Sequence, residues 1–229
     1  MEAASLGAIE WLLSGICHQL AENCLVYDGR PLPLCARCTG AFLGFALALG
    51  VLRAVEPGRP TCWPSGAAAV TLALLAAAWA ADGANSLAAT VWGRALYAPS
   101  NGLRLVSGVG LGLVLGALLY PAYHQVLWRH TSAHRVLATP ARLGALLTAG
   151  ALLATLLWVW RSAPWTLWAA AASVAVLVTL AATNATLLVL LARREGRGES
   201  WPMVAPDLLV GAGTTLAELA LIAGLRALL

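Results

Sequence analysis

Four side chains that bind metals or carry out redox chemistry lie near the start of the chain. Cys17 and His18 are adjacent, and sixteen residues later the sequence LCARCTG, residues 34–40, opens a long apolar run. Cys35 and Cys38 are three residues apart, so they share one face if they lie on a helix. Near a helix N-terminus and beside an arginine, the pKa of a thiol falls, which favours the reactive thiolate.

These residue types support three kinds of chemistry. Thiolates and imidazole bind zinc and similar metals, and Cys17, His18, Cys35 and Cys38 together would offer a tetrahedral set of ligands. Adjacent residues on a helix point to different sides, so one of the first two could be the sole ligand of that pair. A CxxC also fits reversible thiol–disulfide exchange, or a structural disulfide. The five cysteines are an odd number, so a closed set of disulfides would leave one thiol over.

A second polar cluster joins two segments further along the chain. Asp82 and Asn85 are three residues apart, and Ser100 and Asn101 lie just before Arg104. One interpretation is an ion pair between Asp82 and Arg104 that holds two helices together. The other is a pocket in which Arg104 and a helix N-terminus bind an anion and Asp82 acts as a base or further ligand. On the second interpretation, Asp82 and Arg104 are the predicted catalytic residues, and the predicted substrate-binding residues are Arg37, Asn85, Ser100 and Asn101.

The composition indicates what kind of protein positions these residues. The chain is 60% hydrophobic and 10% charged, whereas about a quarter of the residues of a soluble domain are charged. We therefore predict an all-α, polytopic integral membrane protein whose partner is the lipid bilayer. All basic residues other than histidine are arginines, and in such a protein they report topology, so the net charge of +4 does not indicate nucleic-acid binding.

Apolar runs separated by glycine, proline and polar residues predict six transmembrane helices in one domain, residues 1–229. Residues 5–21 are too short and too polar for a confident span, so we expect an interfacial or partly inserted helix that carries Glu10 and His18. No cleavable signal peptide is expected there. Residues 22–34 are predicted to form a turn-rich loop. The predicted spans are residues 36–54, 66–86, 101–119, 141–160, 165–192 and 206–228.

The third span carries two signals of its own. Ser100 or Asn101 is a good N-cap for it. Gly108, Gly112 and Gly116 are four residues apart, so one face is bare and another helix can approach closely, within the chain or in an oligomer.

The arginines predict the orientation of the bundle. With six spans, eight of them fall on one side and six on the other, so the positive-inside rule places the first set in the cytoplasm. The cysteines and the second polar cluster then share the opposite, extracytoplasmic face of the cell's inner membrane. The eight arginines are Arg53, Arg59, Arg129, Arg135, Arg142, Arg193, Arg194 and Arg197.

Three further polar residues have ordinary explanations. His130 and His134 are four apart, but the topology places them on the face away from the cysteines, where interfacial residues are common. Glu218 lies deep in the sixth span, and an intramembrane acid is a functional candidate. A hydrogen bond to Asn184 or Thr183 of the fifth span would account for it equally well.

The motifs CHQ at residues 17–19, RPLPLCARCTG at 30–40, Asp82-Gly83 and SNGLR at 100–104 resemble a family of bacterial and archaeal membrane proteins called domain of unknown function 2085. The resemblance covers residues 17–120, and residues 121–229 look like a helical extension. Asn85 stands where the family usually carries glutamine, and Asn23 where it often carries arginine. The resemblance implies that both polar clusters form one site, and it implies no reaction.

These observations favour a membrane protein with a Cys/His metal site, of zinc or a similar transition metal, beside a polar pocket that handles an anionic or lipid-linked substrate. A thiol–disulfide oxidoreductase coupled to a quinone is the first alternative. A non-enzymatic transporter or assembly subunit, for which the thiols would be dispensable, is the second. The sequence does not distinguish a structural metal from a catalytic one, nor an enzyme from a transporter.

Overall fold

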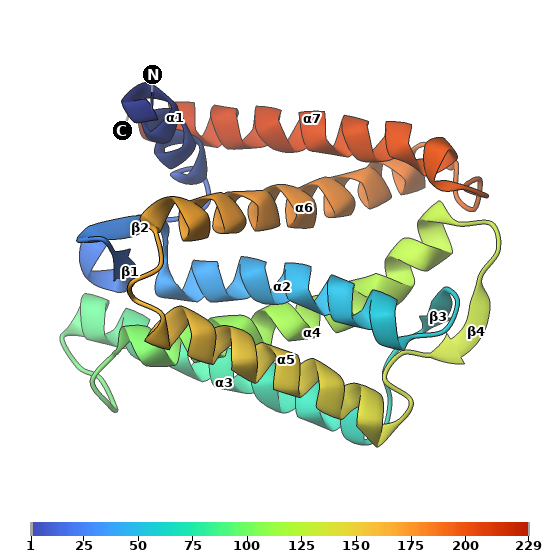
Figure 1. Ribbon diagram of the computed structural model, residues 1–229, viewed down its shortest axis with the longest axis horizontal. Helices are drawn as coiled ribbons and strands as arrows, with labels where there is room; N and C mark the ends of the chain where they lie inside the picture. The colour runs from blue at the N-terminus through green and yellow to red at the C-terminus, as the bar shows by residue number, and fades with distance from the viewer. Residues whose placement is uncertain (1, 229) are drawn as a thin grey trace.

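Six long apolar helices make up most of the fold, and they lie side by side with successive helices running in opposite directions (Figure 1). In this computed structural model, residues 2–228 are described. Each of the six helices is long and apolar enough to cross a membrane, which confirms the predicted all-α membrane bundle. They are α2 (Ala36–Val55), α3 (Ala67–Trp92), α4 (Asn101–Leu127), α5 (Pro140–Val159), α6 (Trp165–Leu191) and α7 (Trp201–Arg226).

Three helices extend beyond their predicted ends. Helix α3 continues to Trp92, and α4 continues to Leu127 with Pro121 inside it. Helix α7 begins at Trp201 and contains Pro206. Proline is a weaker stop signal in a membrane bundle than in water, because neighbouring helices stabilise the kinked segment.

The N-terminal segment differs from both predictions made for it. Helix α1 (Glu2–Leu13) ends well before residue 21, so His18 lies in the connection after it and not on a helix. Residues 22–34 are not an irregular loop, because a 3-10 turn (Ala21–Asn23) leads into an antiparallel hairpin of β1 (Cys24–Tyr27) and β2 (Arg30–Cys35). Its turn is Asp28-Gly29, with φ of +49° and +72°, the backbone that Asp-Gly favours in a two-residue hairpin.

A second small sheet lies at the opposite end of the bundle (Figure 1). Strand β3 (Pro60–Cys62) precedes α3, and β4 (Ser132–Arg135) precedes α5, and the two strands pair in parallel. The pair joins the α2–α3 connection to the α4–α5 connection. The two ends of the bundle are therefore built differently: the hairpin and cysteines lie at one, which we call the motif end, and β3 and β4 lie at the other, the β3–β4 end.

Helices α2 and α4 form the closest contact of the bundle, and glycines make it possible. A Cβ atom on Gly108 would lie 2.2 Å from the carbonyl oxygen of Arg37, and one on Gly112 would lie 2.3 Å from that of Ala41. Only a residue without a side chain fits at such distances, so the predicted close approach along this glycine stripe is confirmed. The contact fixes the first turn of α2, which carries the CxxC, against α4.

The C-terminal helices α6 and α7 pair through polar groups inside the bilayer region. The side-chain amide of Asn184 donates to a carboxylate oxygen of Glu218 (2.7 Å) and to the hydroxyl of Thr215 (3.0 Å). The ordinary explanation for Glu218, a hydrogen bond to Asn184, is therefore confirmed.

Candidate functional site

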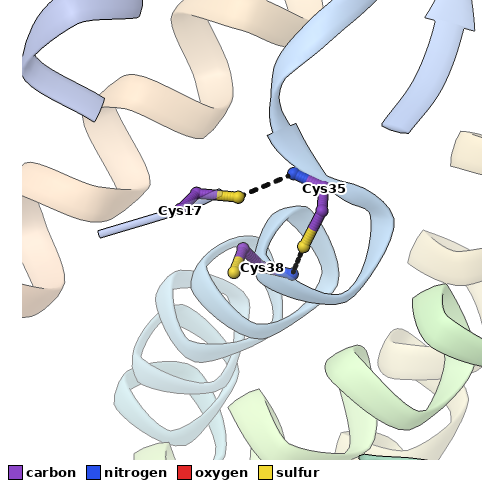
Figure 2. A group of neighbouring side chains, drawn as sticks. All are labelled: Cys17, Cys35 and Cys38. Atoms are coloured by element: carbon purple, nitrogen blue, oxygen red, sulfur yellow. Dashed lines mark hydrogen bonds between the residues drawn. The ribbon is translucent and has the colours of Figure 1, made fainter. Parts of the chain in front are cut away.

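The end of the hairpin and the start of α2 place the CxxC. Strand β2 runs directly into α2, so Cys35 is both the last strand residue and the N-cap of the helix. Its sulfur accepts a hydrogen bond from the backbone N–H of Cys38 (3.5 Å), as Figure 2 shows. The sulfur of Cys17, from the connection after α1, accepts one from the backbone N–H of Cys35 (3.1 Å). These bonds satisfy amides that every helix start leaves free.

The structure brings three thiols together into one group (Figure 2). The sulfur atoms of Cys17, Cys35 and Cys38 all lie within 4.8 Å of one another. Cys17 and Cys35 are buried among apolar side chains of α1, β2, α6 and α7. Sequence spacing alone brings Cys35 and Cys38 together, whereas Cys17 arrives from a separate segment.

His18 is not part of this group. Its side chain is exposed, and its Nδ1 accepts a hydrogen bond from the backbone N–H of Leu20 (3.0 Å). Of the adjacent pair Cys17 and His18, the structure therefore directs only the cysteine towards the CxxC. Residues 17 and 18 are not helical, so the path of this connection, and not helix geometry, separates the two side chains.

Arg226, in the last turn of α7, holds the segment that carries Cys17. Its guanidinium donates to the carbonyl oxygens of Ser14 (2.8 Å), Cys17 (2.7 Å) and His18 (3.1 Å). No sequence pattern connects Arg226 with the thiols, because more than two hundred residues separate Arg226 from Cys17. The C-terminal helix therefore positions a side chain of the N-terminal motif.

The three thiols differ in acidity. The pKa of Cys17 is lowered, first by hydrogen bonding from the Cys35 thiol, then by the Cys38 thiol. The pKa of Cys35 is raised, chiefly because its thiol donates a hydrogen bond to the sulfur of Cys17. The group therefore holds its first negative charge on Cys17. Nearby Cys24 is different, because burial raises the pKa of its thiol to about 12, so it stays protonated.

The second polar cluster is centred on Asp82, whose partner is not the one predicted. The Asp82 carboxylate pairs with the guanidinium of Arg37, which also donates to the hydroxyl of Ser86 (3.0 Å). The predicted ion pair between Asp82 and Arg104 is wrong. Arg104 instead donates to the side-chain oxygen of Asn101 (2.9 Å). The first turn of α2 lies close to α4, and this places Arg37 where it reaches α3.

Two hydroxyls complete the surroundings of Asp82. Those of Tyr97 and Ser107 each donate to its carboxylate, both at 3.2 Å. A cavity of about 450 Å³ adjoins these three side chains, and its remaining lining is apolar. The pKa of the Tyr97 phenol is raised, first by partial loss of contact with water and then by the negative charge of Asp82. The apolar lining residues are Leu75, Ala78, Leu103, Val106 and Gly110.

The other predicted binding residues hold loops and helix ends. Asn85 accepts from the backbone N–H of Leu96 (2.7 Å) and donates to the carbonyl of Tyr97 (2.9 Å), so it fixes the α3–α4 connection. Ser100 caps α4 by accepting from the N–H of residue 103 at 3.3 Å, as predicted. Asn101 donates to the carbonyls of Glu22 (2.9 Å) and residue 24 (3.1 Å), which ties α4 to the hairpin.

Both clusters lie at the motif end of the bundle (Figure 1), and Arg37 connects them. Arg37 stands between Cys35 and Cys38 in sequence, and its guanidinium binds Asp82 of α3. A movement of the first turn of α2 would therefore change both clusters together.

Residues 17–118 match the model of a family described as a predicted membrane protein (DUF2085). That segment, less than half of the chain, is similar to this family. The DUF2085 segment contains both clusters and the α2–α4 contact, and it ends inside α4. No curated protein matches the chain, and no solved structure does. The resemblance expected from the CHQ, CxxC, Asp-Gly and SNGLR motifs is confirmed over this part of the chain.

Proposed function

We propose that Cys17, Cys35 and Cys38 bind one zinc or similar transition-metal ion at the motif end of the bundle. The observation that carries this is the approach of the three sulfurs to within 4.8 Å of one another. Because a Zn–S bond is about 2.3 Å long, two sulfurs on one tetrahedral ion lie about 3.8 Å apart. Side-chain adjustments of up to about one ångström bring the three sulfurs to that spacing.

The donor set suits a thiophilic ion. Thiolates select zinc and other soft or borderline metals over magnesium or calcium. The backbone N–H of Cys35 donates to the Cys17 sulfur and that of Cys38 to the Cys35 sulfur, and such bonds orient metal-bound thiolates. A tetrahedral ion has a fourth position, for which His18, next to Cys17 and exposed, is the nearest candidate in sequence. A water or substrate atom there would instead make the site a catalytic one.

We further propose that the cavity beside Asp82 receives an anionic or lipid-linked substrate on the extracytoplasmic face of the inner membrane. Arg37 brings positive charge next to the cavity through its pairing with Asp82, and its buried Nε–H has no hydrogen-bond partner among the described residues. The apolar walls formed by residues such as Leu103 and Val106 suit a hydrocarbon tail. In this arrangement Arg37 binds the anion, and Asp82 is the group able to accept a proton.

Metal analysis of the purified, detergent-solubilised protein tests the site, together with free-thiol counting on the same sample. We expect about one ion per chain, lost in the Cys35→Ser/Cys38→Ser variant and in Cys17→Ser. Cys62→Ser is the matched control, because Cys62 lies at the other end of the bundle, and it should keep the metal. His18→Ala decides whether the imidazole is the fourth ligand.

A thiol–disulfide oxidoreductase coupled to a bilayer quinone is the second candidate, favoured by the lowered pKa of Cys17 beside a CxxC. Absence of bound metal, with thiols at Cys35 and Cys38 that oxidise and reduce reversibly, would replace the metal proposal by this one. In that case Cys17→Ser and Cys35→Ser should abolish the reaction equally.

A further inference from the structure

A larger cavity, of about 740 Å³, lies at the β3–β4 end of the bundle, away from the thiols. This volume is within the range of about 300–1,000 Å³ that is typical of small-molecule sites. We call it the arginine cavity, because Arg53 and Arg59 both line it. Its lining also includes Tyr120, His124, Trp128, Val178 and Trp201.

The arginine cavity is charged at its rim and apolar inside. Arg53 lies in the last turn of α2, and Arg59 follows in the connection to β3. No described residue gives Arg53 an acidic partner, and the guanidinium of Arg59 stacks on the Trp128 ring at 3.5 Å. From these helix ends the cavity extends between α2 and α6 as far as Val178, near the middle of α6.

Two polar side chains of α4, Tyr120 and His124, line the cavity, and only one of them has a hydrogen-bond partner among the described residues. His124 is satisfied, because its Nδ1 lies 3.2 Å from the carbonyl oxygen of Pro60. The hydroxyl of Tyr120 has no partner among the described residues, although the side chain is only 5% exposed. A buried hydroxyl without a hydrogen bond costs free energy, so its presence points to a ligand that supplies the missing partner.

We propose that the arginine cavity binds one anionic phospholipid, with its phosphate on Arg53 and Arg59 and an acyl chain between α2 and α6. Guanidinium groups bind phosphate oxygens with charge-assisted hydrogen bonds, and a phosphate or ester oxygen can accept from the Tyr120 hydroxyl. Basic pockets between transmembrane helices are suited to anionic lipid head groups. The aromatic rings of Trp128 and Trp201, 4.9 Å apart, both line the cavity, and tryptophan is enriched where head groups meet hydrocarbon.

The test uses tryptophan fluorescence of the purified full chain in detergent, titrated with phosphatidylglycerol that carries bromine on its acyl chains. We expect saturable quenching that is lost in Trp128→Phe/Trp201→Phe, because these two rings line the cavity. Arg53→Gln/Arg59→Gln should weaken binding about 25-fold, since each arginine near a lipid head group is worth about fivefold. The matched control Arg135→Gln/Arg197→Gln removes the same charge outside the cavity and should bind normally.

Tyr120→Phe sharpens the result, because it removes only the unpaired hydroxyl and should weaken binding severalfold. Equal quenching by brominated phosphatidylcholine, unaffected by the arginine substitutions, would mean a gap filled by bulk lipid and would overturn the proposal. Displacement of the lipid by inorganic phosphate at the lipid's own affinity would overturn it in favour of a free-anion site. If the arginine variant does not fold, the comparison of the two lipids on the unsubstituted chain decides.

Discussion

Two buried carboxylates, one at each end of the bundle, are held by arginines in contrasting ways. At the β3–β4 end, Glu56 accepts from the backbone N–H of Leu137 (2.7 Å) and from Arg142 (3.0 Å), and its side chain is completely buried. At the motif end, Asp82 pairs with Arg37 and lies beside a cavity. We call the Glu56–Arg142 pair the closed pair, because its carboxylate is completely buried. We call the Asp82–Arg37 pair the open pair, because its carboxylate lines a cavity.

The difference separates a structural role from a binding role. Glu56 is the C-cap of α2, and its partners Leu137 and Arg142 lie on either side of Thr139, the N-cap of α5. Glu56 therefore holds the end of α2 against the start of α5. All of its bonds are made within the protein, so nothing remains to bind a substrate. Asp82 lines a cavity, and the buried Nε–H of its partner Arg37 has no hydrogen-bond partner among the described residues.

The largest loss in the free energy of unfolding is expected when the closed pair, Glu56 and Arg142, is broken. Glu56→Ala leaves the charge of Arg142 and the Leu137 N–H without a partner, and breaking a buried pair in this way costs about 3–5 kcal/mol. Denaturant-induced unfolding in detergent, followed by circular dichroism, measures it. Glu56→Gln is the control, because it keeps an acceptor for Leu137 and should lose less. An unchanged stability of Glu56→Ala would refute this role of Glu56.

A smaller loss is expected at the open pair. Asp82→Ala should cost about 1–3 kcal/mol, because water can enter the cavity and solvate the remaining Arg37, whose side chain is 21% exposed. The same unfolding experiment gives the value. If Asp82→Ala destabilises the protein as much as Glu56→Ala, the two ends do not differ and Asp82 is structural as well.

The phenol of Tyr97 reports the charge of Asp82 directly. Its pKa is raised by partial loss of contact with water and by the Asp82 carboxylate. Asp82→Asn removes that negative charge, so the pKa of Tyr97 should fall and the phenol should ionise at lower pH. Ultraviolet difference titration with and without Tyr97→Phe isolates this group. Glu56→Gln, at the far end, should leave the titration unchanged.

The smallest effect, on metal content, is expected from substituting Cys24, which lies beside the proposed ligands. Burial raises the pKa of its thiol to about 12, so at pH 8 it is protonated and a poor ligand or nucleophile. Its S–H donates to the carbonyl of Leu20 (3.2 Å), a bond that serine can also make. Cys24→Ser should therefore keep the metal content of the unsubstituted protein. Loss of metal in this variant would add Cys24 to the ligand set.

Much of the fold could be predicted from local sequence. The six spans follow from apolar runs of sufficient length, and the stripe of Gly108 and Gly112 predicts the close helix contact. The hairpin differs from the predicted turn-rich loop, because Asp28-Gly29, Pro31 and Pro33 are typical of loops as well as of a hairpin turn. The end of α4 and the start of α7 differ from prediction at Pro121 and Pro206, because the cost of proline inside a bundle depends on neighbouring helices.

Part of the candidate site could likewise be predicted from local sequence, and part could not. The CxxC thiols are close in sequence, and alternation of the spans predicts that they share an end of the bundle with Asp82. Which arginine pairs with Asp82 could not be predicted, because Arg37 and Arg104 are both placed near it by topology. The α2–α4 contact gives the pairing to Arg37, since it fixes the rotation of α2.

By itself the sequence determined a six-span membrane bundle, the similarity of residues 17–118 to DUF2085, and the two groups of polar residues at one end of the bundle. Hydropathy, helix periodicity and motif spacing carry that information because they act over a few turns of chain. Only the tertiary structure decided that Cys17 joins the CxxC without His18, that Arg226 holds it there, and that the arginine cavity exists. These features depend on how helices distant in sequence rotate and pack against one another, and no local pattern specifies that rotation.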